Sequence, residues 1–401
     1  MLRNKKLVQS FLAFFFLLSS YYILRPLRET MGTVYGDVDQ LFLTVFLIML
    51  GLVPAFGWLS SNLSRGQLFS VVFRSFSVLI LAVAYFVYTS PEIPRWLAGS
   101  LYVLVSVFGV FNISLFWSLM ADIYNSESSK KFFGIITAGG SLGGLLSSLA
   151  TGLLASKFNT AALLLVAVAL LEIFLVLVHR LNKEQSETEQ QTETKASGSI
   201  FAGLKQVLAN KYLLLFACFM LLGKFCSTMV YLQVLDIVAA VEPNIDKRTA
   251  IFAWENLVTQ IISFAFQGYF TAIIIRKVGL PFALSILPIV LGAGFFSLTL
   301  YPSLVVAFCL QVTQRGLAYG IAKPSKEILF TVISREEKYK AKNFMDTVLD
   351  RGADAASSKL YALVSASVAA SSLAFVVVPI ALAWSGVGVL LGFKHKKLSE
   401  N

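Results

Sequence analysis

The sequence predicts an all-α integral membrane protein with about twelve transmembrane helices in two six-helix bundles. Hydrophobic residues make up 57% of the 401 residues and charged residues only 14%, whereas soluble domains carry roughly 25% charged residues. Apolar runs long enough to cross a bilayer recur along the whole chain. This leaves no room for a soluble catalytic domain, so we predict that the protein is not an enzyme.

The expected spans are bounded by glycine, proline or charged clusters. The first follows Arg3, Lys5 and Lys6 and is too long for a signal-peptide core, so we expect it to be retained as a helix. We place the spans at 7–30, 40–60, 67–89, 96–119, 132–156, 160–179, 209–235, 249–275, 281–300, 303–322, 343–368 and 371–392.

A polar, acidic stretch near the midpoint predicts a flexible cytoplasmic linker at 182–200, between an N-terminal bundle (1–181) and a C-terminal bundle (201–401). The two halves also contain similar segments at corresponding positions. SESSKKFFG (126–134) precedes the fifth span, and SREEKYKAKNF (334–344) leads into the eleventh. Repeated six-helix halves resemble the major facilitator superfamily, which implies transport by alternating access through a cavity between the halves.

The positive charge is distributed asymmetrically among the loops. Most of the 33 Lys and Arg residues fall in segments on the same side as the N-terminus. The positive-inside rule then places both termini in the cytoplasm of a multi-pass protein in a bacterial inner membrane. Membrane orientation therefore explains the net charge of +11, and we expect no nucleic-acid partner. We expect a monomer in the lipid bilayer.

Cysteine and histidine give no sign of a metal site. Cys218, Cys226 and Cys309 lie in apolar runs without a CxxC pattern, and His179 and His395 have no partner at metal-ligand spacing. We therefore predict buried packing for the three cysteines, no metal site and no cofactor.

Ionisable residues inside a membrane span cost roughly 2.5–3.5 kcal/mol each, so each is a functional candidate. Arg25 and Arg28 lie one turn apart in the first span, and their guanidinium forks suit a phosphate or carboxylate. The alternative is that Arg28 and Glu29 form a gating ion pair or extend to the outer surface.

Two further cations lie deep in expected spans. Lys224 is halfway along the seventh, where it either contacts substrate or pairs with a carboxylate of a neighbouring helix. Arg315 lies one turn after Gln311, and this spacing predicts a polar strip that faces the cavity. Arg74 and Glu172 lie nearer span ends or on peripheral helices, and we expect structural roles for them.

The eleventh span carries a charged stripe on one helical face, with two more basic residues beside it. We expect an inter-helix ion-pair network, and the alternative is an ion-pair switch or a proton relay. The stripe consists of Lys342, Asp346, Asp350 and Asp354, flanked by Arg351 and Lys359.

The glycine-rich run GGSLGG (139–144) lies inside an apolar span and lacks the strand and the Lys-Ser/Thr pair of a phosphate loop. We expect these glycines to permit close helix packing or a rocking motion of the helices.

Several segments resemble the nucleotide transporter family, the non-mitochondrial ATP/ADP antiporters of plastids and intracellular bacteria. YYILRPLRE (21–29) is similar to the first-helix motif of that family, and KPSKEILFTVISREEKYKAKNFMDTV (323–348) is similar to its segment around the tenth and eleventh helices. The fourth and fifth helices of that family are also similar to segments of this chain, namely LYVLVSVFG (101–109), SLFW (114–117) and KKFFG (130–134). The resemblance implies a transporter that exchanges nucleoside phosphates without hydrolysing them.

The charged positions of that family are only partly kept. Arg28 matches the basic residue of the first helix, but acidic positions fall on Ser106 and near Gln233, and a lysine position falls on Ala318. ATP/ADP exchange then requires that other basic residues take over these roles, the candidates being Lys224, Arg315 and Lys323.

Our first hypothesis is therefore an antiporter of nucleotides or related phosphorylated metabolites, with a small anionic substrate as partner. In this hypothesis the anion contacts are Arg25, Arg28, Lys224 and Arg315, and the base or ribose contacts are Asn112, Trp117 and Tyr319. The expected gating or coupling residues are Glu29, Asp346, Asp350, Arg351 and Asp354.

Two other hypotheses remain open. One is a proton-coupled facilitator for a different small organic solute, in which Asp350 or Asp354 carries the proton. The other is a membrane partner protein that kept a transporter scaffold and moves nothing.

Overall fold

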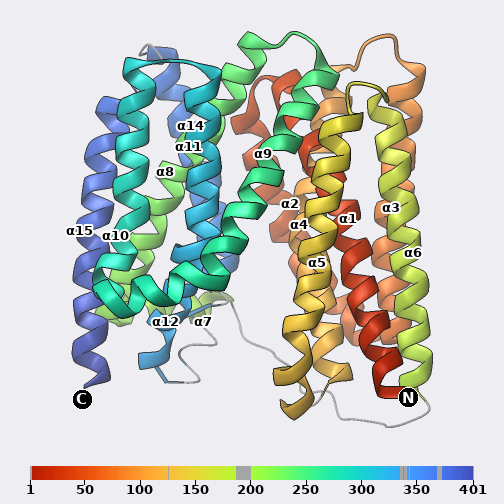
Figure 1. Cartoon of the computed structure of the whole chain (residues 1–401), viewed down its shortest axis with the longest axis horizontal. Coiled ribbons are helices and arrows are strands. Elements are labelled where there is room, and N and C mark those ends of the chain that lie inside the picture. The colour runs from red at the N-terminus through yellow and green to blue at the C-terminus, as the bar shows by residue number, and fades with distance from the viewer. Residues whose placement is uncertain are drawn as a thin grey trace. The chain divides into compact units, whose positions relative to one another are not determined.

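The computed structural model describes residues 2–124, 126–186, 200–334, 337, 341–342, 344–367 and 373–400. Every regular element in these residues is a helix, which confirms the predicted all-α membrane fold (Figure 1).

The chain divides into two compact units. One comprises Met1–Glu193 with Glu242–Leu257, and the other comprises Thr194–Val241 with Val258–Asn401. Most of the predicted linker, residues 187–199, lies outside the described residues.

The first unit is a bundle of long helices around an aromatic core. Large rings such as Phe73, Phe108 and Phe116 are fully buried there, as expected where several helices bring apolar faces together. Its helices are α1 (Leu2–Tyr35), α2 (Val38–Asn62), α3 (Arg65–Thr89), α4 (Arg95–Ile123), α5 (Ser126–Leu154), α6 (Thr160–Ser186) and the start of α9 (Ile245–Ala265).

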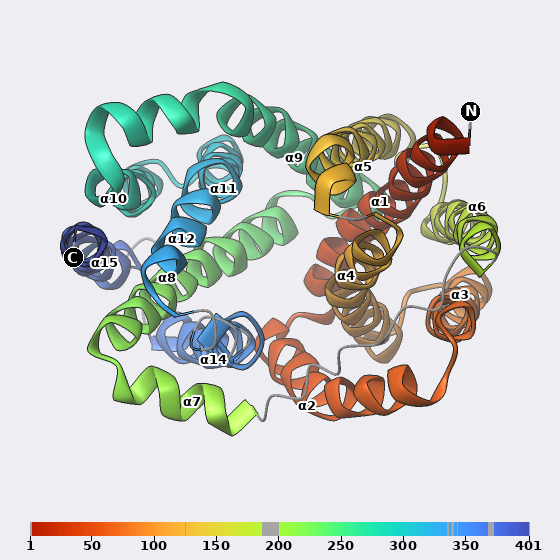
Figure 2. The ribbon, with the colours of Figure 1, turned by 90° about the horizontal axis from the view of Figure 1, so that it is seen from below.

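In the second unit the central helix is α8 (Lys211–Val241), which packs against α11 (Leu304–Leu317), α14 (Asp350–Ser367) and α15 (Ala374–Ser399) (Figure 2). The other α-helices are α7 (Ile200–Ala209), the end of α9, α10 (Thr271–Leu300) and α12 (Lys323–Leu329). Short π-helical turns are η1 (Phe266–Phe270), η2 (Ala318–Ala322) and η4 (Met345–Leu349), and η3 (Phe330–Val332) is a 3₁₀ turn.

Ten helices in the described part of the chain are long and apolar enough to cross a membrane. The two remaining expected spans are also helical: 249–275 lies on α9, η1 and the start of α10, and 343–368 falls mainly on η4 and α14. Between the eighth and ninth expected spans the chain turns at Gly279, whose φ of 81° favours glycine.

The glycine-rich run in α5 packs directly on α1, as predicted. A Cβ atom at Gly139 would lie 2.6 Å from the carbonyl oxygen of Phe11, and one at Gly143 would collide with the carbonyl oxygen of Phe15. The absence of side chains therefore lets the two backbones approach closely.

The predicted burial of the cysteines is right for only one of them. Cys226 is buried, whereas Cys218 and Cys309 are exposed on the surfaces of α8 and α11. An apolar sequence did not distinguish these positions, because a helix face directed at lipid is as apolar as one directed at protein.

Candidate functional site

In the first unit, the charged turn of α1 is buried and internally paired. Glu29 is fully buried, and its Oε1 lies 2.6 Å from Nη2 of Arg28 and 3.9 Å from Nε of Arg25. Tyrosine rings flank both guanidinium groups: Tyr102 lies 5.4 Å from Arg28, and Tyr22 lies 5.9 Å from Arg25. Arg28 and Glu29 thus form an ion pair within the turn, and both a gating role and an anion contact stay predictions.

The predicted base or ribose contacts in this unit lie on α4. Asn112 is fully buried, and its side-chain oxygen accepts a hydrogen bond from the backbone N–H of Ile113. Trp117 packs edge-on against the rings of Phe14 and Phe116. The surroundings of Trp117 are those of a packing residue, and a substrate contact for either side chain stays a prediction.

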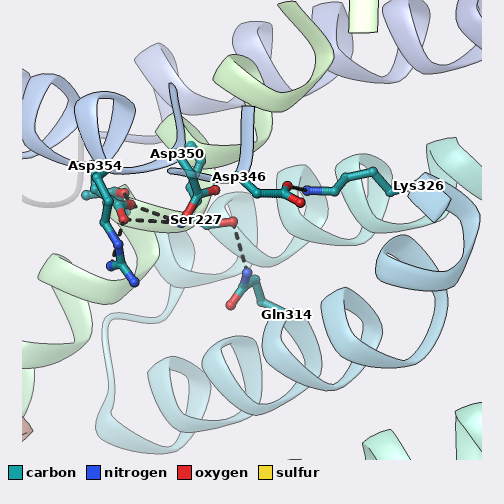
Figure 3. A network of polar contacts seen from close by, with 9 residues as sticks. Ser227, Gln314, Lys326, Asp346, Asp350 and Asp354 are labelled. Carbon is teal, nitrogen blue, oxygen red and sulfur yellow. Dashed lines mark hydrogen bonds and ion pairs between the residues drawn. The ribbon is translucent and has the colours of Figure 1, made fainter. Parts of the chain in front are cut away.

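In the second unit, Lys224 of α8 forms ion pairs with two carboxylates of α14. Its Nζ lies 2.9 Å from Oδ2 of Asp350 and 3.2 Å from Oδ2 of Asp354 (Figure 3). The hydroxyl of Thr228 donates to Asp354 at 3.2 Å, and Nη1 of Arg351 lies 3.7 Å from the same carboxylate. The structure therefore brings together three of the predicted coupling residues and one predicted substrate contact.

The remaining charges of the stripe pair with α12. Lys326 donates to Asp346 at 3.1 Å (Figure 3), and Lys342 donates to both oxygens of Glu327, the shorter distance being 2.6 Å. Because Asp346 lies in the π-helical turn η4, directly before α14, the stripe does not run along one regular α-helix. Its N-terminal part pairs with α12, and its C-terminal part pairs with α8.

Arg315 of α11 is held by a glutamine and a tyrosine. With the amide oxygen of Gln311 turned toward the guanidinium, it accepts from Nε at 3.0 Å and from Nη2 at 2.9 Å. The ring of Tyr231 lies 5.8 Å from the guanidinium carbon, and Gln314 donates to Ser227 at 3.0 Å (Figure 3). The predicted polar strip is thus a contact between α11 and α8, in which Arg315 is only 8% exposed.

The sequence interpretation missed the polar residues of α8 that follow Lys224. Ser227, Thr228 and Tyr231 come three, four and seven residues later, which is the spacing of one helical face. Extending the helical period from Lys224 was the signal that could have identified them.

The neutral residues at the family's charged positions lie in different surroundings. Ser106 is buried and donates to the carbonyl oxygen of Tyr102 in its own helix. Gln233 is buried in α8, and Ala318 begins η2. The neighbouring Tyr319 is 38% exposed, and its carbonyl oxygen accepts from Gln267 at 3.1 Å.

The two peripheral charges differ in their surroundings. Glu172 of α6 accepts a hydrogen bond from Ser77 of α3 at 2.8 Å, which links the two helices. Arg74 is exposed on α3.

A family model described as "Major Facilitator Superfamily" matches residues 11–335. The chain is also 21% identical over 420 residues to "ADP,ATP carrier protein 1" of Chlamydia muridarum (strain MoPn / Nigg), an alignment that covers 86% of this chain and 79% of the relative.

Solved structures with the same fold include transporters of different solutes. A point mutant of the nucleoside transporter NupG has a TM-score of 0.61 and 15% identity over 99% of this chain and 100% of its own. A POT family transporter in complex with 5-aminolevulinic acid has a TM-score of 0.68 and 11% identity over 98% of this chain and 96% of its own. At these identities the likeness shows the fold alone. The family match over most of the chain shows that the protein belongs to the Major Facilitator Superfamily and is a multi-pass membrane transporter.

Proposed function

We propose that the protein exchanges nucleotides or related phosphorylated anions across the membrane by alternating access, without hydrolysing them. The observation that carries this proposal is the largely buried turn of α1, where the guanidinium groups of Arg25 and Arg28 lie side by side next to Glu29. Guanidinium groups bind phosphate oxygens through two parallel hydrogen bonds, and in a dry site such bonds are strong. The turn is thus suited to an anionic group.

Two further observations support an anionic substrate. Arg315 is a second buried guanidinium, oriented by Gln311 and Tyr231. The relative from Chlamydia is named as a carrier of ADP and ATP, and it aligns with most of this chain. We further propose that both termini lie in the cytoplasm of a bacterial cell, because the basic residues concentrate on that side.

The test is uptake of labelled ATP or ADP into proteoliposomes that contain either nucleotide or buffer alone. We expect uptake to be much faster when nucleotide is inside, because exchange uses an internal substrate for the return step. Uptake that is equal with nucleotide or buffer inside contradicts exchange. No uptake of either nucleotide by folded protein contradicts the nucleotide assignment.

A matched pair of variants tests the site. Arg28→Gln combined with Lys224→Gln removes two cations from membrane-spanning helices, and we expect the apparent KM for nucleotide to rise at least tenfold, since each charged hydrogen bond contributes about 1.5–3 kcal/mol. Arg74→Gln removes an exposed arginine from α3 and is expected to leave KM unchanged. Equal KM values in the double variant and the wild type contradict the assignment.

One observation favours a second function, proton-coupled transport of another small organic solute. Asp350 and Asp354 both contact Lys224, and such a group of ionisable residues inside a membrane protein is suited to taking up and releasing a proton. Under this proposal, an imposed pH gradient drives solute uptake into vesicles that contain no substrate. An uptake rate that is insensitive to the gradient contradicts it.

A further inference from the structure

The two aspartates that face Lys224 are held very differently. The side chain of Asp354 is 12% exposed and contacts three groups: Nζ of Lys224, the hydroxyl of Thr228 and Nη1 of Arg351. The side chain of Asp350 is 23% exposed, and among the described residues its carboxylate contacts Lys224 alone, at 2.9 Å (Figure 3). Asp354 is therefore fixed by its surroundings, whereas a single ion pair holds Asp350.

The charges of this cluster balance only while Asp350 takes part. Lys224 and Arg351 contribute two positive charges, and Asp350 and Asp354 contribute two negative charges. Without Asp350 the cluster has an excess of one positive charge. An uncompensated charge at this depth is costly, so the position of Asp350 is one that another anion can fill.

The two cations of the cluster are partly exposed. The side chains of Lys224 and Arg351 are 29% and 33% exposed, which is more than either aspartate. Lys224, Arg351 and Asp350 are therefore more accessible than Asp354.

We propose that Asp350 is an exchangeable counter-ion and that an anionic group of the substrate replaces it on Lys224. In the bound state Lys224 and Arg351 hold the incoming phosphate or carboxylate, and Asp354 remains in place as the fixed partner of both cations. When the anion leaves, Asp350 returns to Lys224. The cluster thus provides an anion subsite in the second unit, and it rests on the proposed function in so far as the substrate carries an anionic group.

Inorganic phosphate is a suitable probe, because it presents the anionic group without the rest of a substrate. The full-length protein in detergent is titrated with sodium phosphate against sodium chloride at constant ionic strength, and the midpoint of thermal unfolding is followed. Asp350→Asn removes the competing carboxylate but keeps an oxygen for Lys224. We expect it to lower the half-saturating phosphate concentration about tenfold relative to the wild type.

A matched control comes from the same pair of helices. Asp236 of α8 accepts a hydrogen bond from Tyr361 of α14 at 2.6 Å, so Asp236→Asn also neutralises a carboxylate between α8 and α14. It should leave phosphate binding as in the wild type. Adding Arg351→Gln to Asp350→Asn should abolish the gain in phosphate affinity, because one of the two cations that bind the anion is lost.

Several outcomes overturn the proposal. One is unchanged phosphate affinity in Asp350→Asn. The others are an equal gain in phosphate affinity in Asp236→Asn and a gain that persists when Arg351→Gln is added. If the asparagine variant is unstable, Asp350→Ala gives the same comparison, because it also removes the competing charge. Tighter phosphate binding in Asp350→Asn together with no ATP or ADP exchange by the wild type supports this anion subsite and refutes the nucleotide assignment, so the two failures are distinguishable.

Discussion

Substitution of Gly139 tests the close packing of α5 on α1. In Gly139→Ala the new methyl group would lie 2.6 Å from the carbonyl oxygen of Phe11 and 2.9 Å from its ring, and contacts below 3.0 Å are essentially never found for real Cβ atoms. The carbonyl belongs to a helical backbone and cannot rotate away, so the two helices must separate. Overpacking of this kind costs about 1–3 kcal/mol, and we expect the upper half of that range because the nearest obstacle is backbone.

The assay is thermal unfolding of the purified protein, with Gly134→Ala as the control. Gly134 lies on the same helix, and a Cβ atom there would meet nothing within 4 Å. The control should be stabilised by roughly 0.5–1 kcal/mol, because alanine favours the helix over glycine. The two alanine variants should therefore melt several degrees apart, with Gly139→Ala the less stable. Equal melting temperatures refute the inference that the glycines set the distance between α1 and α5.

Three further predictions concern individual residues. Tyr212→Phe removes the 2.7 Å hydrogen bond to the carbonyl oxygen of Leu329 and should lower the free energy of unfolding by about 1 kcal/mol in thermal melts; unchanged stability would contradict a structural role. Ser77→Ala leaves Glu172 without this donor and should destabilise the protein by about 1–3 kcal/mol, whereas Ser77→Thr should recover most of the loss. A hydrophobic maleimide should modify the two exposed cysteines of the folded protein but reach Cys226 only on unfolding, as intact mass shows; early modification of Cys226 would contradict its burial.

The positions of the helices follow from the sequence because bilayer thickness sets the length of an apolar run. The turn at Gly279 likewise falls in the gap between the expected spans 249–275 and 281–300, which Arg276 and Lys277 mark in the sequence. Burial is harder to predict, as Cys218 and Cys309 show. A hydrophobic pattern separates protein from water, but it does not separate protein from lipid.

The candidate site was predictable as a set of residues but not as a set of pairs. The spacing of Asp346, Asp350 and Asp354 indicates one face of a helix, and the deep position of Lys224 indicates a functional or paired charge. Which of the carboxylates meets Lys224 depends on how α8 packs against α14, and Asp354 lies 130 residues away along the chain. Local periodicity contains no information about such a contact.

The ion pairs of Lys224 also bear on whether the protein exchanges substrates or moves them one way. A carrier without substrate reorients easily only if its buried charges are compensated, because an uncompensated charge is costly in a membrane. Asp350 compensates Lys224 in the substrate-free state. Its presence therefore favours reorientation of the empty carrier.

Asp350→Asn should shift this balance toward strict exchange. Without the carboxylate, Lys224 and Arg351 retain only Asp354, so the empty carrier bears an excess positive charge that a bound anion removes. We expect the ratio of uptake into substrate-loaded vesicles to uptake into empty vesicles to rise several-fold over the wild type, while Asp236→Asn leaves it unchanged. A ratio that stays the same or falls in Asp350→Asn contradicts this reasoning, because it means that compensation of Lys224 does not limit the return step.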